Sequence, residues 1–194
     1  MKFDSARRSF ATAAMLLLAT FAAFAQPAPS SEPRRPDVIF VPTPEDVVEA
    51  MLTVAKVSGK DVLYDLGSGD GRIVITAARK FGTRGIGYDL DPERISEARE
   101  NARRAGVTDR VRFEQQDIFT AKFTDATVIT MYLLPDVNMR LRPRLLSELK
   151  PGTRIVSHNY DLGDWQPVQR KEMDVNGINH TLYLWIVPQR SGAR

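Results

Sequence analysis

Apolar positions along the middle of the chain switch repeatedly between helical spacing and short continuous runs. The continuous runs predict buried strands, and the spaced positions predict amphipathic helices. Strands are predicted at 61–66, 85–89, 111–114, 126–132 and 154–157. Helices are predicted from 44 until Gly59, over 72–81, from 91 until Gly106 and from 135 until Pro151.

Residues typical of helix ends accompany several of these segments. Thr43 is predicted to cap the first helix and Pro44 to be its first residue, with acidic residues following. Asp91 is predicted to cap the third helix, which Gly106 closes. Pro143 lies inside the fourth helical region and removes a backbone donor there, so a kink or a restart is expected.

The pattern near the C-terminus is different. Two strand-like runs, 168–175 and 178–187, flank the dipeptide Asn176-Gly177, which is a strong hairpin signal. The alternation of strands and helices before it predicts a parallel sheet with helices on both faces. The predicted fold class is therefore α/β: a doubly wound, Rossmann-like, seven-stranded and mostly parallel sheet that ends in an antiparallel hairpin.

The N-terminal residues 1–25 have the pattern of a secretory signal peptide. Basic residues come first, an apolar run follows at 11–24, and 23–25 forms a small-x-small cleavage site. The run is shorter than the ~20 residues that a membrane span needs. Arg7 and Arg8 resemble a twin-arginine export signal. We therefore expect an exported, periplasmic protein, or a membrane-anchored one if the signal stays uncleaved.

Composition narrows the possible classes of protein further. The Pro- and Ser-rich residues 26–40 are expected to form an exposed linker, followed by one domain over 41–188 and a tail over 189–194. The sequence has no Cys, which excludes disulfides and cysteine nucleophiles, and with only two His we expect no metal site. The net charge of +3, from 27 basic and 24 acidic residues, does not indicate a nucleic-acid partner.

The candidate chemistry begins at a glycine-rich turn between the first strand and the next helix. Such a turn lets the backbone approach a cofactor closely. Its glycines are Gly67, Gly69 and Gly71, whereas a dinucleotide loop would place a glycine at the position of Arg72. Asp65 precedes the turn, and a carboxylate there suits an ammonium or sulfonium group better than a pyrophosphate.

Two further acids follow the next two strands. Asp89 ends the second predicted strand, where its carboxylate can accept hydrogen bonds from ribose hydroxyls. Asp117 follows the third, where it can accept from an adenine amino group or cap a loop. Together with Asp65, these acids favour S-adenosylmethionine over a dinucleotide.

These segments resemble the first three motifs of the class I (seven-stranded) S-adenosylmethionine-dependent methyltransferases. The similar segments are DLGSGDG at 65–71, GYDLDPE at 87–93 and QQDIF at 115–119. The resemblance covers roughly residues 40–187 and implies S-adenosyl-L-methionine as the cofactor. The residues that it implies as cofactor contacts are Asp65, Gly67, Ser68, Gly69, Gly71, Asp89, Leu90, Asp117 and Ile118.

A narrower resemblance lies upstream of the loop. FVPTPE at 40–45 is similar to a segment of the FAM173-type protein-lysine methyltransferases and, more distantly, of the DOT1 histone methyltransferases. It implies that Val41–Glu45 folds over the methionine end of the cofactor, with Pro42 and Thr43 as contacts. It also implies a protein partner whose lysine accepts the methyl group. Tyr132, after the fourth strand, is the candidate for the acceptor pocket, with a core aromatic as the alternative.

The roles of the two histidines and two alternative functions are the remaining predictions from the sequence. His158 ends the fifth predicted strand, where it orients a substrate or, as we favour, bonds a loop carbonyl; His180 is expected to be structural. The export signal also fits a non-catalytic cofactor-binding or structural protein outside the cytoplasm. An NAD-type oxidoreductase is less favoured, because Arg72 stands where its loop needs glycine. The oligomeric state is left open.

Overall fold

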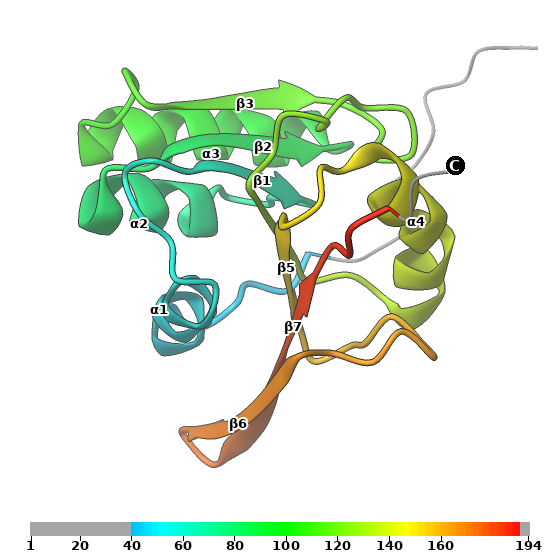
Figure 1. Ribbon diagram of the computed structural model, residues 1–194. Helices are drawn as coiled ribbons and strands as arrows, with labels where there is room; N and C mark the ends of the chain where they lie inside the picture. Colours follow the sequence, from blue (N-terminus) through cyan, green and yellow to red (C-terminus); the bar gives the residue numbers. More distant parts are fainter. Residues whose placement is uncertain (1–39, 191–194) are drawn as a thin grey trace, which may run out of the picture. The chain divides into compact units, whose positions relative to one another are not determined.

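The computed structural model describes residues 40–190, which Figure 1 draws in colour. The predicted signal peptide at 1–25 lies outside the described residues, as do the predicted linker 26–40, except for its last residue, and 191–194 of the predicted tail. Within the described part, no helix is both long and apolar enough to cross a membrane. The domain limits of 41–188 stay a prediction.

All the strands and helices predicted for this part of the chain form. The strands are β1 (Val62–Leu66), β2 (Arg84–Asp89), β3 (Val111–Gln115), β4 (Val128–Met131), β5 (Arg154–His158), β6 (Gln169–Val175) and β7 (Ile178–Ile186). The helices are α1 (Glu45–Val54), α2 (Arg72–Phe81), α3 (Pro92–Ala105) and α4 (Pro135–Glu148).

The strands join one seven-stranded sheet in the order β3-β2-β1-β4-β5-β7-β6. β1 pairs in parallel with β2 on one side and with β4 on the other, and β5 continues the parallel part. β7 then pairs antiparallel with both β5 and β6. The predicted fold class, including the C-terminal hairpin, is confirmed.

Helices cover both faces of the sheet (Figure 1). One buried cluster joins α1, α2 and α3 to the sheet and includes Val48, Val74 and Ala98. A second cluster on the other face joins α4 to the segment after β3 and includes Leu141 and Phe123. The burial of these apolar faces is the main term that holds the helices against the sheet.

The start of α1 differs from the prediction. Pro44, not Thr43, occupies the N-cap position, and no side chain caps the helix. The predicted cap is wrong because the Thr43 hydroxyl turns away from the helix, to 3.3 Å from Nδ1 of His158. At α3 the prediction is confirmed, since the Asp91 carboxylate accepts a hydrogen bond from the backbone N–H of Glu93.

The helix α4 contains Pro143 and still runs as one element from Pro135 to Glu148. The expected restart at Pro143 therefore does not occur. Leu141 and Leu145, on either side of the proline, are fully buried. Their packing offsets the loss of one helical hydrogen bond, because tertiary burial contributes more to helix stability than any single backbone bond.

Candidate active site

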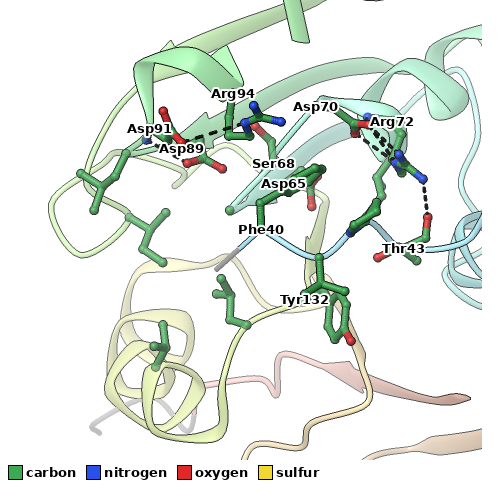
Figure 2. Close-up of a pocket in the computed structure, with 18 residues that line it drawn as sticks. Phe40, Thr43, Asp65, Ser68, Asp70, Arg72, Asp89, Asp91, Arg94 and Tyr132 are labelled. Carbon is green, nitrogen blue, oxygen red and sulfur yellow. Dashed lines mark hydrogen bonds and ion pairs between the residues drawn. The ribbon is translucent and has the colours of Figure 1, made fainter. Parts of the chain in front are cut away.

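A cavity of about 340 Å³ lies at the carboxyl ends of β1, β2 and β4. The strand order reverses at β1, which has β2 on one side and β4 on the other, and open α/β sheets bind ligands at such a point. Figure 2 shows Asp89 toward one end of the cavity, Thr43 and Tyr132 toward the other, and Asp65 between them.

Asp65 contributes a deeply buried carboxyl group to this cavity. Its residue is 2% exposed, and Oδ1 accepts a 2.7 Å hydrogen bond from the hydroxyl of Thr130 on the neighbouring strand β4. Burial, with smaller contributions from the nearby Asp89 and Asp70, raises the pKa of the Asp65 carboxyl to about 8, although the hydrogen bond from Thr130 lowers it. A cationic group that entered the cavity would stabilise the ionised form of Asp65.

The carboxylate of Asp89 accepts hydrogen bonds from two turns beside the cavity, the glycine loop and the turn before α3. Its Oδ2 accepts from the backbone N–H of Gly69 at 2.8 Å, and its Oδ1 accepts from that of Asp91 at 3.0 Å. Each carboxylate oxygen has two lone pairs. Both oxygens therefore retain acceptor capacity for hydroxyl groups of a ligand.

Two positions of the loop, Gly67 and Gly71, require glycine for different reasons. Gly67 and Gly71 both have φ of +81°, a conformation that side chains disfavour. Gly67 lines the cavity, and a Cβ there would lie 2.7 Å from Leu133. A Cβ at Gly71 would instead lie 2.6 Å from the ring of Phe113. Gly71 thus allows the start of α2 to pack closely on β3.

Ser68 carries an unpaired hydroxyl at the cavity wall. The residue is 5% exposed, and its Oγ has no hydrogen-bond partner among residues 40–190. Buried side-chain oxygens are usually paired. This hydroxyl is therefore a candidate contact for a bound ligand.

The segment before α1 lies against the glycine loop. The ring of Phe40 packs on Gly69, where a Cβ would overlap it. The guanidinium of Arg94, from α3, lies 5.0 Å from the centre of that ring. Phe40 therefore forms part of the cavity wall, together with Val41 and Pro42.

Arg72 ties this segment to the loop. Its Nη2 donates to Asp70 at 2.6 Å and its Nε at 3.0 Å, which gives a bidentate pair, while Nη1 donates to the carbonyl oxygen of Thr43 at 2.9 Å. Arg72, which stands where a dinucleotide loop has glycine, thus holds the segment before α1 at the wall of the cavity.

Tyr132 lies at the end of the cavity opposite Asp89, and its ring is close to His158, which in turn contacts His180. The ring centroids of Tyr132 and His158 are 4.0 Å apart, and Tyr132 lines the cavity. Nε2 of His158 lies 2.8 Å from Nδ1 of His180. The expected bond of His158 to a loop carbonyl is replaced by these contacts and by the one with Thr43.

The cavity collects most of the predicted site residues. Those that line it are Pro42, Thr43, Asp65, Gly67, Ser68, Asp89, Leu90, Ile118 and Tyr132. Gly69, Gly71 and Asp117 are not among the lining residues. The Asp117 carboxylate accepts from the backbone N–H of Phe119 at 2.9 Å, which is the loop-capping alternative.

Other residues also line the cavity but were not predicted from the sequence as cofactor contacts: Phe40, Asp70, Arg72, Ile73, Asp91, Arg94, Leu133 and Val137. The Asp-x-Arg spacing of Asp70 and Arg72 was the available signal, because a side-chain pair two residues apart at a helix start restrains the turn. In the described part, no three His, Asp or Glu side chains are grouped so that they could hold a metal ion.

The cavity has the chemistry that S-adenosylmethionine requires. The buried carboxyl of Asp65 suits an ammonium group, Asp89 suits hydroxyl groups, and Ser68 offers an unpaired oxygen. Leu90 and Ile118 supply apolar surface beside Asp89. The residues present therefore fit a ligand with a charged end, a ribose and a flat apolar base.

Comparisons with known proteins agree with this chemistry. The model of the ANTKMT methyltransferase domain matches residues 65–169. A protein-lysine N-methyltransferase of Saccharolobus islandicus is 46% identical over 78% of this chain and 95% of its own length. The mouse adenine nucleotide translocase lysine N-methyltransferase is 36% identical over 74% of this chain, which spans 62% of that protein.

A solved structure is also similar. It is described as an RNA methyltransferase from Salinibacter ruber in complex with S-adenosyl-L-homocysteine, and it is 51% identical with a TM-score of 0.73. The match covers 79% of this chain and 98% of that one. The comparisons do not favour the oxidoreductase and the non-catalytic binding protein. The chain belongs to the ANTKMT methyltransferase family and is an S-adenosylmethionine-dependent methyltransferase.

Proposed function

We propose that this enzyme transfers the methyl group to a lysine side chain of a protein. The observation that carries the proposal is the aromatic group at one end of the cavity, where Tyr132 lines the wall and its ring lies close to those of His158 and Tyr160. The names of the archaeal and mouse relatives, both lysine N-methyltransferases, support it. Tyr132 is proposed to line the channel through which the lysine reaches the methyl group.

The cofactor supplies a methyl group that its sulfonium already activates, so the protein must place a neutral amine in line with it. A free lysine has a pKa near 10.4, and making it neutral at pH 7 costs roughly 4–5 kcal/mol. The aromatic and aliphatic walls formed by Tyr132 and Leu133 exclude water and so lower the pKa of the lysine that enters.

The cofactor's binding residues are proposed from the lining of the cavity. Asp65 would hold the ammonium group, Asp89 the ribose hydroxyls, and Leu90 with Ile118 the adenine. Pro42 and Thr43 would contact the methionine end. Gly69, Gly71 and Asp117 do not line the cavity and are proposed to shape the loops around the cofactor.

RNA is the second candidate acceptor, because of the description of the similar Salinibacter structure. RNA binding needs cations that are free to meet phosphates. Of the arginines on α4, Arg142 pairs with Asp164, and Arg144 pairs with Glu148 while its Nη1 and Nη2 donate to two backbone carbonyls. This pairing favours the protein acceptor.

The acceptor can be identified by labelling. Full-length enzyme and S-[methyl-³H]-adenosylmethionine are incubated with the protein fraction or the total RNA of the same cells, and labelled protein is digested for mass spectrometry. We expect methylated lysine in the protein fraction. The label should be lost with Asp89→Asn and kept with the matched control Asp174→Asn in the hairpin. Label in RNA alone would overturn the proposal.

We also propose that the protein is exported. The signal-peptide pattern of residues 1–25 supports this. Since S-adenosylmethionine is made in the cytosol, export of folded protein with bound cofactor would allow one turnover. N-terminal sequencing of the protein from cell fractions tests the proposal. A periplasmic form that begins at Gln26 is expected, and an intact N-terminus found only in the cytoplasm would refute it.

A further inference from the structure

Three polar side chains from distant parts of the sequence form a chain that ends at the cofactor cavity. Thr43 lies just before α1, His158 ends β5, and His180 lies on β7. The contacts run from Thr43 Oγ1 to His158 Nδ1 at 3.3 Å and from His158 Nε2 to His180 Nδ1 at 2.8 Å. All three residues are buried, and Thr43 lines the cavity.

The register of the sheet explains why the two rings meet. His158 pairs with Leu182 across β5 and β7. His180 precedes Leu182 by two positions on the same strand, so both point to the same face of the sheet. His180 is therefore the diagonal neighbour of His158, on the face that α1 covers.

The hydrogen bonds restrict how protons are placed on this chain. Burial, and to a smaller extent His180, lowers the pKa of His158 to about 4, so its ring is neutral and has one N–H at pH 7. If that proton were on Nε2, it would be donated to His180 Nδ1. The proton of His180 would then be on Nε2, an atom that has no partner among residues 40–190.

The other arrangement leaves no N–H unpaired. His180 donates its Nδ1–H to Nε2 of His158, and His158 donates its Nδ1–H to Oγ1 of Thr43. Only a lone pair on His180 then lacks a partner, and buried acceptors tolerate this better than buried donors do. Thr43 accepts in this arrangement, so its own hydroxyl hydrogen is free to be donated elsewhere.

We propose that His158 and His180 are positioning residues that orient the Thr43 hydroxyl as a donor toward the carboxylate of the cofactor's methionine end. The hydroxyl hydrogen of Thr43 suits the carboxylate, which only accepts, and the buried carboxyl of Asp65 supplies the site for the ammonium group. The two charged groups of the cofactor are thereby distinguished. The proposal rests on the S-adenosylmethionine cofactor and is independent of which molecule accepts the methyl group.

The tautomers can be observed directly in the wild-type protein. The sequence has only two His, so untagged, ¹⁵N-labelled full-length protein gives two imidazole systems in a long-range ¹H–¹⁵N correlation spectrum. We expect a proton on Nδ1 of both rings. A proton on Nε2 of His158 would overturn the proposal, and this measurement needs no variant.

Variants at His158 separate the two contacts of its ring. In His158→Asn the amide nitrogen takes the place of Nδ1 and can still donate to Thr43. In His158→Gln the amide takes the place of Nε2 and can contact only His180. We expect His158→Gln and Thr43→Val to weaken S-adenosylhomocysteine binding about tenfold, as for a lost charge-assisted hydrogen bond. The conservative variants Thr43→Ser and His158→Asn should bind S-adenosylhomocysteine with an affinity within about threefold of that of the wild type.

A cofactor analogue provides the control for a merely structural role. S-adenosylhomocysteine without its carboxylate keeps the ammonium group but has nothing for Thr43 to donate to. Its affinity, measured by calorimetry, should change less than about twofold in His158→Gln and Thr43→Val. Equal weakening of both ligands would mean that the histidines only support the fold, and this result would refute the proposal. Because no methyl acceptor is used, the outcome is separate from that of the lysine proposal.

Discussion

Binding of the cofactor is expected to remove a proton from Asp65. Burial raises the pKa of its carboxyl group to about 8, with Asp89 and Asp70 adding to the effect against the hydroxyl of Thr130. At pH 7 about nine in ten of these carboxyls are protonated, and ionising one costs about 1.4 kcal/mol. An ammonium group placed beside Asp65 stabilises the ionised form, so the carboxyl loses its proton on binding.

Calorimetry measures this proton directly. At pH 6.5, titration with S-adenosylhomocysteine in two buffers of different ionisation enthalpy should show the release of nearly one proton. The affinity should rise up to tenfold per pH unit below pH 7.5 and stop rising above about pH 8, where the carboxyl of Asp65 is already ionised in the ligand-free protein. Asp65→Asn keeps an oxygen for Thr130 but should release no proton.

The pH dependence of the stability of the ligand-free protein provides a second measurement of the ionisation of Asp65. The folded pKa of Asp65 is raised above its unfolded value, so the folded state holds more protons between about pH 4 and pH 8. The free energy of unfolding should therefore fall as the pH rises through this window. Asp65→Asn should flatten the dependence, whereas Asp174→Asn in the hairpin should leave it unchanged. Equal slopes in wild type and Asp65→Asn, with no proton release, would refute the reasoning.

Three further substitutions and one control, Gly82→Ala, test the loop and the cavity. In Gly71→Ala the new Cβ would lie 2.6 Å from Phe113 at a φ of +81°, so the free energy of urea unfolding should fall by about 3 kcal/mol or more. In Gly82→Ala the φ is +70° but the space around the Cβ is open, so the free energy of unfolding should fall by only about 1–2 kcal/mol. Arg72→Lys loses the bidentate pair and should raise the Kd of S-adenosylhomocysteine about three- to tenfold by calorimetry, and an unchanged Kd would contradict its positioning role. Tyr132→Ala should lower kcat for a lysine substrate at least about tenfold with little change in cofactor Kd, because the cavity loses the aromatic side chain proposed to shield the lysine from water. An unaltered kcat would exclude Tyr132 from the acceptor pocket.

The glycine loop was accessible to sequence reasoning because its chemistry is local. Asp65, the glycines and the helix that starts at Arg72 follow one another along the chain, so their proximity needs no knowledge of the sheet. The position of Asp89 followed from one general rule, that the carboxyl ends of neighbouring parallel strands meet at one edge. The pairing of Arg72 with Asp70 and the carbonyl of Thr43 was not predictable, since the path of the upstream segment depends on tertiary packing.

Thr43 shows how a local rule fails when a distant group competes. Its sequence context favours a helix cap, which contributes about 1 kcal/mol. The imidazole of His158, 115 positions away in the sequence, offers its hydroxyl a buried partner instead. A hydrogen bond shielded from water is stronger than one at an exposed helix end. The first turn of α1 then forms without a side-chain cap.

The antiparallel hairpin adds a residue to the functional edge of the sheet. In the parallel part, the site draws on residues at the carboxyl ends of the strands, such as Asp65, Asp89 and Tyr132. Because β7 runs in the opposite direction, its first half lies at this same edge, and the pairing of His158 with Leu182 brings His180 beyond the end of β5. A strand that appears only to widen the sheet thereby supplies the second ring behind Thr43. Changes in the register of β7 should consequently disturb cofactor binding as well as stability.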